Sequence, residues 1–131
     1  MLRIIIICFL IVQFLENLAQ NLSKKEVEII SLVKKNNDAA IKLLEKAVNI
    51  NSGTMNLEGV KEVGMLFKDQ FDQLGMDTRW IDLTELNRAG HLFAENYGSK
   101  GKRVLLIGHL DTVFPKNSPF QKMQYLPNGV V

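Results

Sequence analysis

Two residues of this sequence, His109 and Asp111, have the types and the spacing that suit chemistry. They follow a run of apolar residues, 104–107, which Gly108 ends. If the backbone stays extended there, side chains two positions apart point to the same side. A carboxylate beside an imidazole accepts one ring N–H and leaves the other ring nitrogen available to a metal ion. The pattern therefore predicts a metal ligand at His109 and its orienting carboxylate at Asp111.

The spacing of this pair leaves a structural interpretation open, in which His109 is a hydrogen-bonded loop residue. An H-x-D triplet is short and recurs in unrelated sequences by chance. Nucleophilic catalysis is less attractive, because Ser52, Ser99 and Ser118 lack the strand–turn–helix context of a nucleophile elbow. The other histidine, His91, falls in a predicted strand and is interpreted as an ordinary sheet residue.

Helical periodicity marks residues 22–49 and 57–74. In the first segment, Ser23 and Glu26 have the spacing of a capping box, and the segment forms either one continuous helix or two. In the second segment, Gly75 stands where a C′ glycine ends a helix. The apolar or small positions of the second segment recur every three or four residues: Val60, Val63, Gly64, Phe67, Phe71 and Leu74. This stripe predicts that the second helix packs against a sheet.

Three strands are predicted after these helices, at 76–83, 91–97 and 103–108. The continuous apolar run of the third strand favours a central position with both faces covered. Residues 114–131 hold all three prolines and predict an extended loop. The order of elements predicts an α/β fold with helices packed on a mixed β-sheet. Ligands of open α/β sheets bind beyond the carboxyl ends of the strands, where His109 stands.

Length and composition are those of one ordinary globular domain. The chain has 131 residues, of which 47% are hydrophobic and 23% are charged, and this balance argues against disorder. The formal net charge is +2, with the two signs interspersed along the chain. No nucleic-acid-binding surface is therefore expected.

Residues 1–20 have the pattern of a secretory signal peptide. Arg3 supplies a positive start, an apolar stretch follows, and Ala19 offers a small residue for cleavage. The stretch is short for a membrane span, so no stable membrane insertion is expected after cleavage, and an uncleaved signal anchor is the alternative. Cleavage would remove Cys8, the one cysteine. The exported chain, periplasmic or secreted, is then expected to fold without a disulfide.

A second motif accompanies the G-H-L-D-T-V-F-P box at 108–115. It reads S-G-T-M-N at 52–56 and is followed by Gly59-Val60 and Leu74-Gly75. With these residues the sequence resembles the N-terminal part of zinc metallopeptidases of the aminoacylase and glutamate carboxypeptidase type. The box after an apolar strand is specific to that superfamily. The resemblance runs from about residue 38 to the end of the chain and favours the carboxypeptidase G branch.

This resemblance implies a metal role for His109 and a catalytic-site role for Asp111. His109 matches the histidine that binds one of two zinc ions, and Asp111 matches the acidic residue that orients it. The carboxypeptidase G branch removes C-terminal glutamate from peptide-like or folate substrates. In the family, two zinc ions share a bridging water and polarise the scissile carbonyl, while a glutamate serves as general base.

The resemblance also implies that residues 21–131 are the N-terminal part of a catalytic domain. Zinc needs three or four protein ligands, and the family's bridging aspartate lies in a glycine-rich box that residues 1–131 do not contain. The sequence singles out none of four carboxylates near the predicted strand ends: Asp77, Asp82, Glu85 and Glu95. The chain is expected to be a truncated or partial family member, inactive alone, with a homodimer left open for the full-length form. The alternative is a small exported domain that binds a ligand or partner without catalysis.

Overall fold

The computed structural model describes residues 22–127 and 129, and the predicted signal peptide lies outside them. The chain divides into two units, 1–39 and 40–131. Within the described part of the chain, no helix has the length and apolar character needed to cross a membrane.

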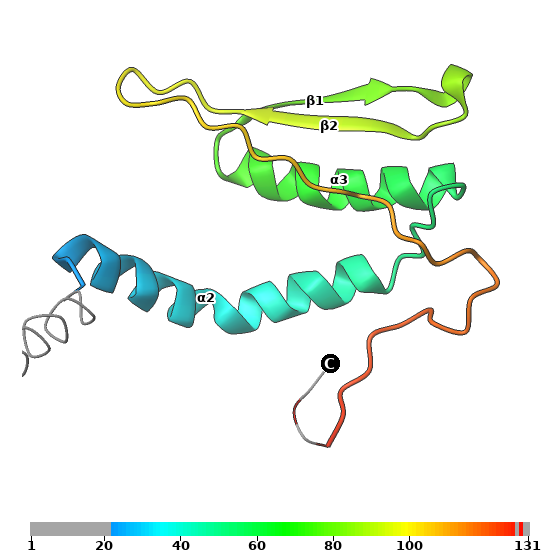
Figure 1. The fold of residues 1–131 in the computed structure, drawn as a ribbon, viewed down its shortest axis with the longest axis horizontal. Helices are drawn as coiled ribbons and strands as arrows, with labels where there is room; N and C mark the ends of the chain where they lie inside the picture. Colours follow the sequence, from blue (N-terminus) through cyan, green and yellow to red (C-terminus); the bar gives the residue numbers. More distant parts are fainter. Residues whose placement is uncertain (1–21, 128, 130–131) are drawn as a thin grey trace, which may run out of the picture. The chain divides into compact units, whose positions relative to one another are not determined.

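Helix α2 (Lys24–Val48) is continuous, which decides between the one-helix and two-helix predictions (Figure 1). Its first turn is the predicted capping box. The Glu26 N–H donates to the Ser23 hydroxyl (3.3 Å), and the Ser23 N–H donates to the Glu26 carboxylate (2.6 Å). Two N–H groups at the helix start are thereby satisfied. None of the residues of α2 is fully buried.

This capping box has a consequence for pH. The Ser23 hydroxyl, followed by the Ser23 N–H, lowers the pKa of Glu26 below its usual range. A lowered folded pKa stabilises the helix start above the ordinary glutamate pKa of about 4.3, and this stabilisation is lost as the pH falls through the lower folded value. In Ser23→Ala, we expect the Glu26 pKa to return toward its ordinary value in a carboxyl-carbon NMR titration. Ser31→Ala, a serine of α2 outside the cap, is the control, and an unchanged Glu26 titration in Ser23→Ala would contradict the capping box.

Helix α3 (Leu57–Gln73) confirms the second predicted helix. Its N-cap is Asn56, whose side-chain oxygen accepts a hydrogen bond from the first turn. At its other end, the Gly75 N–H donates to the Asp72 carbonyl (2.9 Å). Gly75 has a φ of +72°, in the left-handed region that favours glycine at a helix C′ position. Both ends of α3 therefore lie where the local sequence places them.

Strands β1 (Asp77–Asp82) and β2 (Gly90–Glu95) pair antiparallel and are joined through the short 3-10 helix η1 (Thr84–Leu86) (Figure 1). Helix α3 packs against this sheet, because Gly64 has no side chain to keep the Trp80 indole away. Among the residues that the structure describes, the buried hydrophobic ones are Val60, Val63 and Ala89. A helix packed on a sheet confirms the predicted α/β class. Strands β1 and β2 confirm the first two predicted strands.

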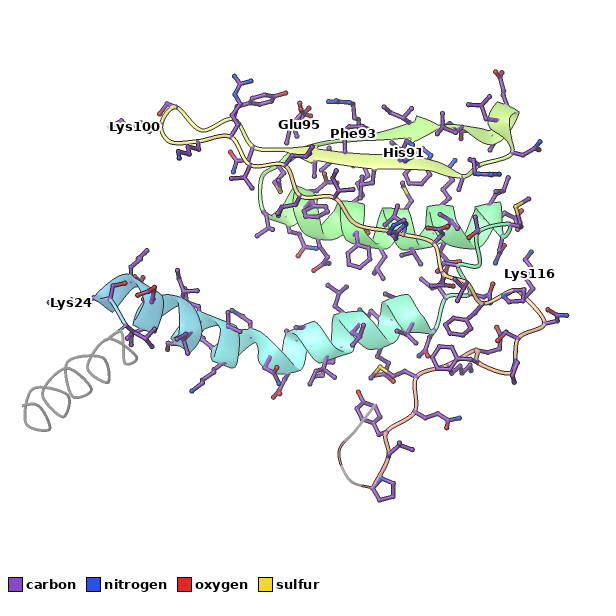
Figure 2. The ribbon with its side chains drawn as sticks, viewed as in Figure 1. Lys24, His91, Phe93, Glu95, Lys100 and Lys116 are labelled. Carbon is purple, nitrogen blue, oxygen red and sulfur yellow. The ribbon has the colours of Figure 1, made fainter. Side chains whose placement is uncertain are left out.

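The exposed face of the sheet carries polar and aromatic side chains, since alternate residues of a strand point to opposite faces. Arg79 pairs with Glu95 at 2.5 Å, and its guanidinium lies 4.9 Å from the ring centroid of Phe93. His91 lies opposite Ile81 in the ladder and is exposed on β2, near Phe93 (Figure 2). The prediction of His91 as a sheet residue is confirmed.

The predicted strand at 103–108 is wrong, because this run forms no strand in the structure. Residues 104–107 are between 78% and 89% exposed. A continuous apolar run becomes a central strand only when strands on both sides accept and donate its backbone hydrogen bonds. Strands β1 and β2 pair with each other, and over residues 22–127 no backbone hydrogen bond reaches 103–108. The sheet is antiparallel, and parallel pairing is limited to one isolated bridge between Gly53 and Thr112.

Candidate functional site

The candidate site forms where the turn before α3 meets the loop after the apolar run. The two segments join in the parallel bridge between Gly53 and Thr112. The Thr112 N–H donates to the Ser52 carbonyl (2.8 Å), and the Thr54 N–H donates to the Thr112 carbonyl (3.1 Å). These backbone bonds place the loop that carries Asp111 directly beside the S-G-T-M-N motif.

Asn51 holds the same two segments together a second time. Its side-chain nitrogen lies 3.2 Å from the carbonyl oxygens of both Phe114 and Pro115. Its own carbonyl accepts a hydrogen bond from the Asn56 side chain (2.6 Å), which connects this contact to the N-cap of α3. Loop carbonyls have no ladder partner, so side-chain amides supply the hydrogen bonds that a strand would have made. The loop is thereby anchored to the start of α3.

Two glycines allow close backbone contacts here, Gly53 between the turn and the loop and Gly59 between α3 and the turn itself. A Cβ on Gly53 would clash with the carbonyl of Phe114, and a Cβ on Gly59 would clash with the carbonyl of Asn51. Both glycines are buried. The S-G-T-M-N motif is therefore the surface against which the histidine-bearing loop docks, and Gly59 lets the turn that carries the motif lie close to α3.

Asp111 has a partner on each carboxylate oxygen. Its Oδ2 accepts a hydrogen bond from the Thr54 hydroxyl (2.7 Å), and its Oδ1 lies 3.3 Å from Nδ1 of His109. The Thr54 hydroxyl lowers the pKa of Asp111 below its usual range, partial burial opposes this, and His109 adds a smaller lowering. Asp111 is therefore ionised at neutral pH and accepts hydrogen bonds on both oxygens.

The structure brings together the two residues that the sequence singled out. The His109 side chain is 90% exposed, whereas that of Asp111 is 33% exposed. When Nδ1–H of His109 donates to Asp111, Nε2 keeps its lone pair for a metal ion. This arrangement fits one ligand of a zinc site, which needs three or four. Over the residues that the structure describes, no three His, Cys, Asp or Glu side chains converge on a further site, so these residues do not form a complete zinc centre.

The other candidates from the sequence lie apart from this pair or are occupied. Glu95 pairs with Arg79, and Asp82 accepts a hydrogen bond from the Thr84 hydroxyl (2.6 Å). Ser52 is 3% exposed, so its hydroxyl is withheld from a substrate. Within residues 22–127, no hydrogen bond or ion pair joins His109 or Asp111 to the remaining candidates: Asp77, Glu85, His91, Ser99 and Ser118.

Sequence reasoning did not assign a role to Thr54 or Asn51, which the structure places in the site. Both lie in the turn cluster before α3, whose polar residues predict a turn but not its contact partner. No spacing rule connects position 54 to position 111, because their contact depends on the path of the chain between them. The available signal was the presence of Thr54 in the motif that accompanies the histidine box.

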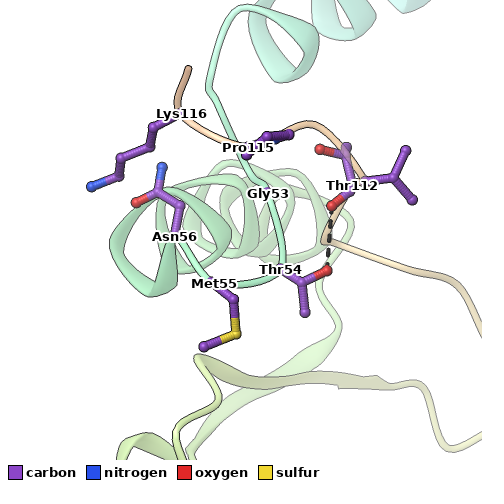
Figure 3. A pocket seen from close by; sticks show the side chains of 8 residues that line it. Gly53, Thr54, Met55, Asn56, Thr112, Pro115 and Lys116 are labelled. Carbon is purple, nitrogen blue, oxygen red and sulfur yellow. Dashed lines mark hydrogen bonds between the residues drawn. The ribbon is translucent and has the colours of Figure 1, made fainter. Parts of the chain in front are cut away.

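An open pocket of about 420 Å³ lies between the turn and the loop at this docking region. Its lining residues come from the turn and from the loop: Gly53, Thr54, Met55, Asn56, Thr112, Val113, Pro115 and Lys116. Figure 3 shows Asn56 and Lys116 on one side of it, with Thr54 and Thr112 on another. His109 and Asp111 are not among the lining residues, so the pocket is a neighbour of the pair and does not contain it.

Comparison with known proteins adds one relationship. No family model matches the chain, and no solved structure matches it. The chain is 36% identical over 83 residues to carboxypeptidase G2 of Pseudomonas sp. (strain RS-16). The match covers 60% of this chain but 19% of the carboxypeptidase, so the matched segment spans about a fifth of that protein's length. The similarity indicates a carboxypeptidase G-like relationship.

Proposed function

We propose that this chain carries part of the active site of a zinc-dependent exopeptidase of the carboxypeptidase type. His109 is the proposed zinc ligand, through Nε2, and Asp111 is the proposed residue that orients it. The proposed substrate is a peptide-like small molecule that loses a C-terminal amino acid, such as glutamate. The observation that carries the proposal is the hydrogen-bonded chain from Thr54 through Asp111 to His109, which leaves Nε2 on an exposed side chain.

The chain's own residues contribute orientation rather than a complete reaction. Zinc, when bound, supplies Lewis-acid activation of a water and of the scissile carbonyl. Asp111 holds the ring of His109 in one tautomer and makes its free nitrogen more basic. Because one histidine does not complete a zinc site, we propose that residues 1–131 alone are inactive. Further ligands and a general base are then required from outside the described residues.

Export and assembly belong to the same proposal. The pattern at residues 1–20 supports export, either to the periplasm or out of the cell. A homodimer of the full-length form is proposed from the family resemblance.

A chimera tests the proposed function. The 83-residue segment of the Pseudomonas carboxypeptidase is replaced by the matching segment of this chain, and zinc-dependent hydrolysis of that enzyme's substrate is measured. We expect the chimera to be active and residues 1–131 alone to be inactive with zinc. His109→Ala in the chimera should lower activity by more than the roughly 10–100-fold that loss of a ligand's outer partner costs. His91→Ala is the matched control and should leave activity unchanged, since His91 lies on the exposed face of the hairpin.

Two results would overturn the proposal. Hydrolysis by residues 1–131 alone that depends on His109 would show that no further ligands are needed. A folded chimera that binds substrate but shows no hydrolysis would favour the alternative of a domain that binds without catalysis.

A further inference from the structure

The Thr54 hydroxyl and the Asp111 carboxylate form the shortest contact between two side chains in the candidate site. Thr54 Oγ1 lies 2.7 Å from Asp111 Oδ2, which is the usual distance for a hydroxyl that donates to a carboxylate. The other carboxylate oxygen lies 3.3 Å from His109 Nδ1. Each oxygen of Asp111 therefore has its own partner, and the carboxylate plane is set by both.

The same hydroxyl has a second acceptor within reach. Thr54 Oγ1 lies 3.3 Å from the Thr112 carbonyl, the bond drawn in Figure 3. A hydroxyl has one proton, and a hydrogen bond to an ionised acceptor is shorter and stronger than one to a neutral carbonyl. The bond to Asp111 is thus the dominant one, and the Thr112 carbonyl is already satisfied by the Thr54 N–H (3.1 Å).

The backbone of Thr54 is anchored, which limits where its hydroxyl can lie. Its N–H donates to the Thr112 carbonyl (3.1 Å), next to the bridge between Gly53 and Thr112, and its β-branched side chain has few rotamers. Asp111 lies in a loop, and the side chain of His109 is 90% exposed. Orientation therefore passes from the anchored turn to the exposed ring.

We propose that Thr54 is a positioning residue that fixes the Asp111 carboxylate and, through it, the tautomer and ring orientation of His109. In this arrangement Nδ1 carries the proton, which it donates to Asp111, and Nε2 presents its lone pair outward. The catalytic meaning of the proposal rests on the proposed function, whereas its geometry does not. Thr54 touches neither metal nor substrate and acts through Asp111.

The test uses NMR of the ¹⁵N-labelled chain, in which long-range ¹H–¹⁵N correlations report the tautomer of each histidine. At about pH 8, above the ordinary histidine pKa, we expect His109 to be mainly the Nδ1–H tautomer. Thr54→Val keeps the shape of the side chain but lacks the hydroxyl, and should lower the Nδ1–H fraction of His109. Thr54→Ser keeps the hydroxyl, so its Nδ1–H fraction of His109 should equal that of the natural chain. His91 in the same spectra is the internal control and should not change.

A structural role for Thr54 predicts a different result. Loss of stability alone would be seen as a lower urea midpoint with an unchanged tautomer in the folded protein, and that outcome would overturn the proposal. If Thr54→Val does not fold, Thr54→Ala, which adds no steric demand, carries the same comparison. An equal Nδ1–H fraction in the valine or alanine variant and the natural chain would likewise refute it.

The chimera separates this proposal from the proposed function. In an active chimera, Thr54→Val should lower kcat about 10–100-fold with little change in KM, and Thr54→Ser should recover most of it. An inactive chimera whose His109 tautomer still responds to Thr54→Val would refute the function and leave the positioning role intact. An active chimera in which Thr54→Val changes neither kcat nor the tautomer of His109 would refute the positioning role alone.

Discussion

A chain in which Leu105 and Ile107 are both replaced by lysine is expected to stay monomeric at concentrations at which the natural chain self-associates. These residues are 80% and 86% exposed, within four consecutive apolar residues that are all exposed. A run of this kind with unpaired backbone groups is a template for pairing with another chain. In an extended segment the two residues share one side, so the double substitution charges that side completely.

The expected effect is large because burying each such side chain contributes about 1.5–3 kcal/mol. Removing two of them weakens association by about a hundredfold or more. Sedimentation velocity over a concentration series measures the change directly. Val113→Lys is the matched control, since Val113 is 87% exposed but lies outside the run, and it should leave self-association nearly unchanged. A natural chain that remains monomeric at every soluble concentration would refute the prediction.

The same run shows why the sequence could not predict the whole fold. The features of α2 and α3 are local: a capping serine, a helical stripe and the C′ glycine Gly75 each act within a few residues, and the structure contains them. A central strand is not local, because residues 103–108 need partners supplied by other parts of a sheet. The apolar run predicts a strand wherever partners exist, and β1 and β2 pair with each other instead.

In the candidate site too, contacts between residues close in sequence could be predicted, whereas contacts between distant residues could not. His109 and Asp111 stand two positions apart, so their contact could be predicted from backbone geometry. In the structure, Nδ1 of His109 lies 3.3 Å from Oδ1 of Asp111. The contact of Thr54 with Asp111 joins residues 57 positions apart and could not be predicted from spacing. The family resemblance placed both motifs in one protein, and the clash that a Cβ on Gly53 would cause gives a physical reason for their joint presence.

Substitution of Gly59, at the start of α3, is expected to have the second large effect, a loss in the free energy of unfolding. In Gly59→Ala, helix propensity alone would predict a gain of up to about 1 kcal/mol in the free energy of unfolding. The new Cβ would instead meet the Asn51 carbonyl and the Asn56 side chain. Overpacking of this kind costs about 1–3 kcal/mol, and disturbing an N-cap such as Asn56 costs about 0.5–2 kcal/mol more. The steric terms exceed the propensity, so we expect a net loss of about 2 kcal/mol.

Urea unfolding followed by the fluorescence of Trp80, the one tryptophan, measures this loss, because its indole lies against α3. A loss of that size lowers the midpoint by about 1 M. Gly98→Ala and Gly108→Ala are matched controls: a Cβ at Gly98 has an ordinary contact at 3.8 Å, and one at Gly108 meets nothing within 4 Å. Neither control should lower the midpoint. If Gly59→Ala were as stable as the natural chain, the close contact of Asn51 with α3 would be absent, and with it the anchor that holds Thr54 against Asp111.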